Sequence, residues 1–152
     1  MQDSLDNLPI AGAGLQVADP VVQQIHFSQP ENCKLTYDAL VLDARLRQSL
    51  VTMRSLGHRG LRVAALESAS NVETTTSVPT FSSRWCQRKF VAPSYVEHPE
   101  PYLAYLEQLL DSTGARVLIT SSDGTVAVIR QYREQLERRV RIALAGDPAL
   151  GL

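Results

Sequence analysis

Cysteine and histidine are scarce in this sequence. Its 152 residues include two cysteines and three histidines. They are Cys33, Cys86, His26, His58 and His98. Two cysteines cannot form a disulfide framework, and the five side chains do not share the spacing of a zinc site. We therefore expect neither a disulfide scaffold nor a bound metal, and we expect Cys86 to be an inert thiol because no His or acid lies near it in sequence.

Long apolar runs and an excess of charge of one sign are also missing. The longest apolar runs fall far short of the roughly 20 residues that a membrane-spanning helix needs. The net charge of −1 gives no reason to expect nucleic acid or an anionic membrane as a partner. The first residues include no Lys or Arg and no sustained apolar core, which is unlike a secretory signal. We expect a cytoplasmic protein.

The charge is unevenly distributed, and this marks a boundary near Asp38. Positions 1–38 hold five acidic residues and one Lys, whereas positions 39–152 hold eleven acidic and fourteen basic residues. Proline and glycine interrupt the first part, which shows no sustained period. The sequence predicts an irregular extension over 1–36, with one candidate strand at 21–27, and a single folded domain over 37–152.

Apolar runs alternate with helical patterns from Tyr37 onward. Helical periodicity extends over 46–57, 102–110 and 125–136, and 67–85 resembles a long polar loop with one helical turn near its end. The apolar runs predict strands at 39–44, 61–66, 88–93, 115–120 and 139–145. This alternation is typical of an α/β fold, a three-layer open sheet of about five mainly parallel strands with helices on both faces. Such a Rossmann-like sheet binds ligands beyond the carboxyl ends of its strands.

Glycine is missing from the turn that follows the first predicted strand. A dinucleotide-binding domain needs G-x-G-x-x-G there, and this chain has D-A-R-L-R-Q at 43–48. The glycines at 11–15 lack a strand before them and a helix after them, and no Walker A loop is present. A receiver domain would need an acidic cluster after the first strand, an Asp after the third and a Lys after the fifth, but Asp43 stands alone. A degenerate receiver is kept only as an alternative.

Two arginines and several small polar residues follow the predicted strands. Arg45 and Arg47 could hold a carboxylate or phosphate with paired hydrogen bonds, and cations at a helix start oppose its dipole and so need another reason to be there. Asp43 either orients Arg45 or ends the strand. Ser122 and Asp123 either cap the third helix or contact a ligand or a neighbouring domain. No residue is assigned a catalytic role.

Three stretches resemble the N-terminal domain of ATP-grasp ligases. They are "LVLDARLRQSLVTMRSLGHRGLRVAALES", "PTFSSRWCQRKFVAPS" and "PEPYLAYLEQLLDSTGARVLITSSDGTVAVIRQYREQLE", and together they cover about three quarters of the chain. The likeness is greatest to the carbamoyl-phosphate-synthase-like, or carboxylate–amine ligase, group. It adds Ser82, Ser83 and Arg84 to the candidate site, because a Ser-Arg pair precedes the third strand in that group. The sequence departs from the group at 71–78, which looks lengthened, and at Thr120 and Ser121, where proline and threonine are commoner.

The resemblance implies a domain that lines the acceptor side of a ligase active site. Such an enzyme joins a small carboxylate substrate to an amine through an acyl-phosphate. ATP and Mg²⁺ would be held by a C-terminal ATP-grasp module of the same polypeptide, whose motifs these 152 residues lack, so we expect the isolated chain to be inactive. A self-standing binding or oligomerisation module is the alternative, and apolar residues on the uncovered face could pair two chains as a homodimer.

Overall fold

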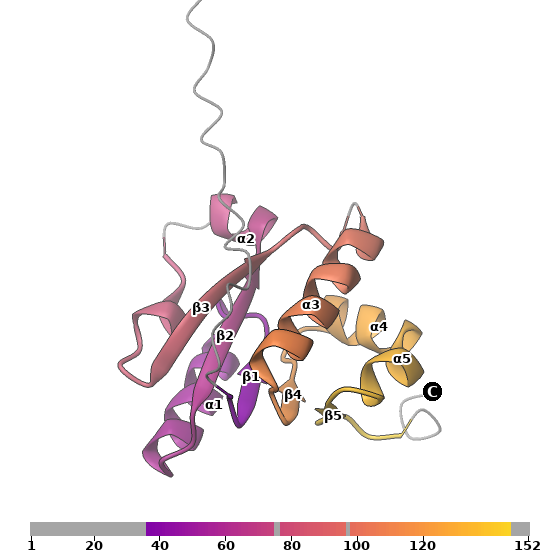
Figure 1. Ribbon diagram of the computed structural model, residues 1–152. Coiled ribbons are helices and arrows are strands. Elements are labelled where there is room, and N and C mark those ends of the chain that lie inside the picture. The colour runs from indigo at the N-terminus through magenta and orange to yellow at the C-terminus, as the bar shows by residue number, and fades with distance from the viewer. Residues whose placement is uncertain (1–35, 75–76, 97, 147–152) are drawn as a thin grey trace, which may run out of the picture.

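The computed structural model describes residues 36–74, 77–96 and 98–146, and within them five strands form one parallel sheet. The strand order is β3-β2-β1-β4-β5, and every neighbouring pair is parallel (Figure 1). The strands are β1 (Ala39–Val41), β2 (Val63–Ser68), β3 (Cys86–Ala92), β4 (Val117–Ile119) and β5 (Arg141–Ile142). The predicted α/β fold with an open parallel sheet is confirmed.

Helices cover both faces of the sheet. On one face, α1 (Arg47–His58), α2 (Ala69–Thr74) and the 3₁₀ helix η1 (Pro79–Ser82) pack against Val41 and its neighbours. On the other, α3 (Pro99–Thr113), α4 (Asp123–Gln131) and α5 (Arg133–Glu137) pack against Leu40 and Leu42. Successive residues of β1 therefore point to opposite layers, as a strand buried on both faces requires.

The connections reverse direction between β1 and β4. The chain runs from β1 to β2 and β3 through helices on one face, and then returns through α3 to β4, on the other side of β1. This places the topological switch point, where open α/β sheets bind ligands, at the carboxyl ends of β1 and β4. Receiver domains have the order 2-1-3-4-5, so the observed order argues against the receiver alternative.

Several predicted element bounds differ from the structure. The predicted strand 39–44 ends early because Asp43 leaves the extended conformation, with φ 56°. The strand predicted at 139–145 shrinks to two residues because the amides of Arg139 and Val140 still bond to the Leu136 carbonyl of α5. The predicted loop 67–85 contains α2 and η1.

Two further predictions concern regions outside the sheet. The candidate strand at 21–27 lies outside the described residues. None of the helices in the described part of the chain is long and apolar enough to cross a membrane.

Candidate functional site

A tight turn without glycine connects β1 to α1 at the switch point. The Leu46 amide donates to the Asp43 carbonyl at 2.9 Å, and the Ala44 amide donates to the Leu66 carbonyl of β2 at 3.2 Å. Asp43 takes the left-handed conformation, which Asp tolerates better than most residues other than glycine. The turn thus replaces a glycine-rich phosphate loop with one that carries a carboxylate.

The Asp43 carboxylate binds the first turn of α4. Its Oδ2 accepts hydrogen bonds from the amides of Ser121 and Ser122 at 2.8 and 3.0 Å. The same oxygen accepts from the hydroxyls of Thr120 and Thr125 at 3.0 and 2.8 Å, and Oδ1 accepts from Ser122 Oγ at 3.1 Å. Asp43 is 4% exposed. Since helix N-termini attract anions, this side chain already occupies the anion position at α4.

Ser122 is the N-cap of α4. Capping is one of the two roles that the sequence allowed for Ser122, the other being a contact with a ligand or a neighbouring domain. Ser122 Oγ accepts from the Thr125 amide at 3.2 Å, and Asp123 is the first helical residue. Both residues lie at the carboxyl edge of the sheet with Asp43, as predicted from topology.

A second buried carboxylate, Glu67, lies at the end of β2. It is 1% exposed. Its Oε2 accepts from the Arg45 amide at 2.7 Å, and its Oε1 accepts from the Ser68 amide and from Asn71 Nδ2, both at 2.8 Å. Glu67 therefore fixes the turn before α1. Sequence analysis missed this role because it assigned Glu67 to a polar loop, although an acid directly after a buried strand was a usable signal.

Two tyrosines lie against each other near the start of α4. The Tyr95 and Tyr102 rings meet edge to face with centroids 5.4 Å apart. A Cβ added at Gly124 would lie 2.9 Å from the Tyr95 hydroxyl, so Tyr95 rests on the first turn of α4. Burial, with smaller effects of Asp43, Tyr95 and Glu67, raises the pKa of Tyr102 well above its ordinary value, so its hydroxyl stays neutral.

The start of α1 offers an anion position that no described side chain fills. Its N-cap residue, Leu46, provides no side-chain hydrogen bond, and the first turn contains no acidic residue. Arg45 and Arg47 are both exposed, and neither forms an ion pair with a described acid. Uncapped amides and two free guanidinium groups together favour a negatively charged group at this point.

The Ser-Arg segment before β3 runs from the carboxyl edge toward the amino edge of the sheet. Its beginning lies beside Arg45, because the Thr80 amide in η1 donates to the Ala44 carbonyl at 3.3 Å. Arg84, however, lies near the end of α1, which corrects its expected place beside Arg45. Ser82 ends η1, and Ser83 Oγ accepts from the Trp85 amide at 3.3 Å. Arg84 stacks over the Trp85 ring at 4.8 Å, and Trp85 packs on Gly57 near the end of α1. The reason is topological: in a parallel sheet the connection from β2 must return to the amino edge before β3 can begin.

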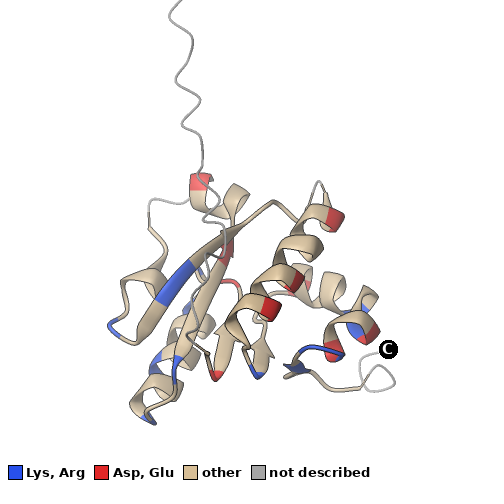
Figure 2. Ribbon diagram, viewed as in Figure 1, with Lys and Arg blue, Asp and Glu red and all other residues tan. Residues whose placement is uncertain are grey.

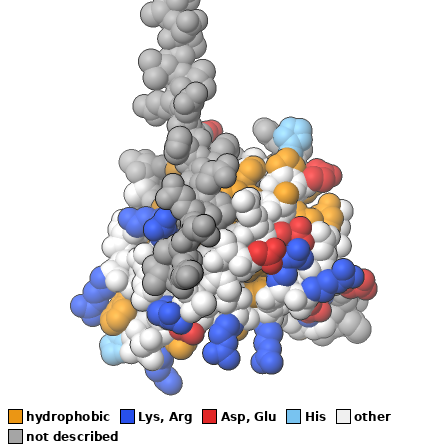
Figure 3. All heavy atoms as spheres, in the orientation of Figure 1, with side chains coloured by type: hydrophobic (Ala, Val, Ile, Leu, Met, Phe, Trp, Pro, Cys, Tyr) orange, Lys and Arg blue, Asp and Glu red, His pale blue; other side chains and the backbone are white. Residues whose placement is uncertain are grey.

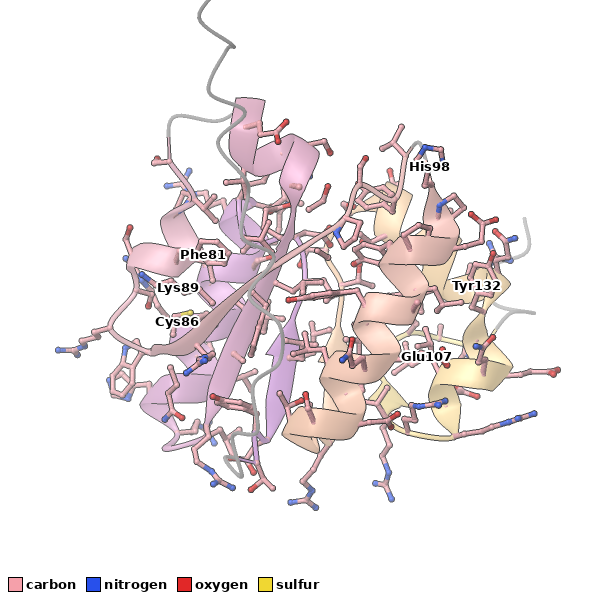
Figure 4. All side chains as sticks on the ribbon, turned by 45° about the horizontal axis from the view of Figure 1, so that its top comes forward. Phe81, Cys86, Lys89, His98, Glu107 and Tyr132 are labelled. Carbon is pink, nitrogen blue, oxygen red and sulfur yellow. The ribbon has the colours of Figure 1, made fainter. Side chains whose placement is uncertain are left out.

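The described residues show no activated thiol and no metal cluster. Cys86 is half-buried, its Sγ contacts the Arg88 carbonyl at 3.3 Å, and burial raises its pKa above the ordinary value. His98 lies at the start of α3, far across the molecule from Cys86 (Figure 4). His58 packs its ring on Trp85, with centroids 5.8 Å apart. The described ranges contain no group of three His, Cys, Asp or Glu side chains placed to hold a metal ion.

The raised pKa of Cys86 gives a pH prediction. At any pH below its pKa, a smaller fraction of this thiol is ionised than in a free cysteine, and only the thiolate is alkylated. In the Cys33→Ser variant, iodoacetamide should therefore modify Cys86 more slowly than free cysteine at neutral pH, with a midpoint displaced to higher pH. The same variant in denaturant is the control and should react like free cysteine. Fast alkylation at neutral pH in the folded state would contradict this account of Cys86.

Comparison with known proteins adds no assignment: no family model matches the chain, and a search of curated proteins finds no significant match.

Proposed function

We propose that this domain is the substrate-side domain of an ATP-grasp carboxylate–amine ligase, in which an acyl-phosphate links a small carboxylate to an amine. The parallel sheet with order β3-β2-β1-β4-β5 and the glycine-free turn after β1 support this proposal. At the switch point the Asp43 carboxylate already accepts from the amides before α4, which a nucleotide phosphate would otherwise use, and Tyr95 lies against Gly124 in the first turn of that helix. ATP and Mg²⁺ would be held by an ATP-grasp module of the same polypeptide.

The observation that carries the proposal is the pairing of Arg45 and Arg47 with the uncapped start of α1. A carboxylate or an acyl-phosphate needs donors on more than one side. Guanidinium groups supply paired N–H donors, and the first amides of the helix supply the rest. Glu67 contributes indirectly, because its bond to the Arg45 amide fixes where that residue leaves the turn.

The binding role of Arg45 and Arg47 can be tested with simple anions. Titration with succinate and with acetyl phosphate, followed by amide chemical shifts, should perturb residues 45–49. Replacing Arg45 or Arg47 by Ala should weaken binding about fivefold each, since each exposed, hydrogen-bonded charge contributes about 1 kcal/mol. Arg54→Ala is the matched control, because Arg54 is exposed on the same helix. Equal effects of all three substitutions would remove the specific site.

The ligase part of the proposal has a separate test. Incubated with Mg·ATP, a carboxylate and hydroxylamine, the 152-residue chain should release no phosphate and form no hydroxamate. The gene read beyond codon 152 should encode an ATP-grasp module, and the longer polypeptide should form the hydroxamate. A stop codon directly after Leu152, combined with anion binding at Arg45, would favour the self-standing binding module instead.

A further inference from the structure

A groove lies at the amino edge of the sheet, at the opposite end of β1 and β4 from the proposed substrate site. It has a volume of about 490 Å³, and it is bounded by the start of β4, the start of β5 and the turn between α5 and β5. Basic residues occupy all three of these segments (Figure 2). Figure 3 shows Lys and Arg side chains projecting along this edge of the surface. The groove is thus a positively charged concavity.

Three arginines of the groove have no partner among the described residues. Arg116, Arg138 and Arg141 are exposed, and their guanidinium groups form no ion pair or hydrogen bond within the described ranges. Arg116 and Arg141 are also close neighbours, because the Arg141 amide donates to the Arg116 carbonyl at 3.1 Å. Arg116, Arg138 and Arg141 therefore all line the same groove of about 490 Å³.

The acidic residues of the groove are already paired with other cations. Asp38 Oδ2 accepts from the Arg62 amide at 2.8 Å and lies 3.8 Å from Arg62 Nε. Glu137 Oε1 lies 2.8 Å from Arg133 Nε. These carboxylates balance Arg62 and Arg133, so the three free guanidinium groups remain uncompensated.

Arg139, also in the groove, is held by α3. Its Nε lies 2.9 Å from Asp111, and its Nη1 lies 3.0 Å from Glu107, which faces α5 (Figure 4). A neighbouring groove beyond Arg138 contains three glutamates among four arginines, so its charge is nearly balanced. The groove at the amino edge thus has a larger excess of positive charge than this neighbouring groove.

We propose that this groove binds a small anion carrying two or more phosphate groups. A guanidinium group donates paired hydrogen bonds to phosphate oxygens. Three free guanidinium groups offer more donors and more positive charge than a single monoanion can pair with. The volume is that of a small-molecule site. Leu61, which is 38% exposed, lies in the groove with Val117 and Val140 and can contact an apolar part of the ligand. Among the described residues no aromatic side chain lines it, and these residues therefore provide no stacking platform of the kind used by single-stranded nucleic-acid sites.

The test is titration of the 152-residue chain with inorganic pyrophosphate and with geranyl diphosphate, followed by calorimetry and amide chemical shifts. Saturable binding should perturb the amides of Val117, Val140 and Arg141. Geranyl diphosphate should bind more tightly than pyrophosphate because of the apolar floor. Binding should weaken as salt is added, since exposed charges are screened.

Substitutions assign the binding to this groove. Arg116→Ala, Arg138→Ala and Arg141→Ala should each weaken pyrophosphate binding about tenfold. Arg54→Ala and Arg88→Ala, which remove exposed arginines elsewhere, should change it by less than about twofold. Absence of saturable binding, or equal weakening by all five variants, would overturn the proposal. Binding of a poly-glutamate peptide without binding of pyrophosphate would also overturn it and indicate a protein partner.

This proposal and the proposed ligase role fail separately. The groove and the start of α1 lie at opposite edges of the sheet, so Arg116→Ala should leave succinate binding unchanged. Arg45→Ala should likewise leave pyrophosphate binding in the groove unchanged. Either result can therefore be negative while the other stands.

Discussion

Replacing Asp43 by Asn should lower the free energy of unfolding by about 3 kcal/mol. The carboxylate accepts five hydrogen bonds from the segment that begins α4, and it is almost fully buried. Four of the five donors share Oδ2, so an amide oxygen at that position still faces them but carries no charge, and hydrogen bonds to a charged group are about twice as strong as neutral ones. The amide NH₂ also replaces the oxygen that accepts from Ser122 Oγ. Urea denaturation followed by circular dichroism measures the change.

Two further substitutions separate the hydrogen bonds of Asp43 from its backbone conformation. Asp43→Ala should cost about 4 kcal/mol, because a β-carbon without a polar side chain at φ 56° adds strain. Asp43→Gly removes the same hydrogen bonds without that strain and should be about 1 kcal/mol less destabilising than Ala. Asp38→Asn is the control: Asp38 precedes β1 and accepts one amide bond, from Arg62, and its loss should cost about 1 kcal/mol. If Asp43→Asn lowered the free energy of unfolding no more than Asp38→Asn does, Asp43 would not hold the ends of β1 and β4 together.

Gly57→Ala should destabilise the protein by about 2 kcal/mol, although alanine favours helix more than glycine does. A Cβ at this position would lie 2.6 Å from Trp85 Cβ and 2.8 Å from Trp85 Cγ. Because the Trp85 Cβ is fixed to the backbone, relief requires α1 to move away from β3, and overpacking of this kind costs about 1–3 kcal/mol. The gain in helix propensity of about 1 kcal/mol offsets only part of this.

The chain offers two controls for Gly57. Ser55→Ala lies on the exposed side of the same helix and should be neutral or slightly stabilising. In a Trp85→Ala background two of the three close contacts disappear, so the cost of Gly57→Ala should fall by about 1 kcal/mol in a double-mutant cycle. Trp85 is the chain's single tryptophan, so its fluorescence reports the displacement directly. An unchanged cost in both backgrounds would show that the tight contact with Trp85 is not the cause.

The fold could be predicted because burial on both faces is visible in a sequence. Stretches such as 39–44 and 61–66 are apolar without alternation, and they are separated by helical periods. The exact ends of the strands were harder to predict from the sequence, because they depend on hydrogen-bond partners elsewhere in the chain. β5 is short because the turn after α5 continues through Val140. No local sequence pattern indicates where this turn ends.

The candidate site was predicted in part. Topology correctly brought Asp43, Ser122 and Asp123 to one edge, because each follows a strand of the same parallel sheet. The sequence could not reveal that the Asp43 carboxylate bonds to the start of α4, since that depends on which strand lies beside β1. Arg84 was misplaced because the whole connection 67–84 was expected at the carboxyl edge, although its end must return to the amino edge before β3 begins.

The bonds made by Asp43 also bear on how the chain folds. The Glu67 bond to Arg45 spans 22 positions, whereas the bonds from Asp43 span 77 to 82. Closing the longer loop costs roughly 1 kcal/mol more in chain entropy. The strands β1, β2 and β3 can therefore assemble from nearby segments, and β4 and β5 join them through a contact of high sequence separation. Asp43 lies where β1 meets β4, the two neighbouring strands that are farthest apart in sequence, and we expect its hydrogen bonds to stabilise the pairing that completes the sheet.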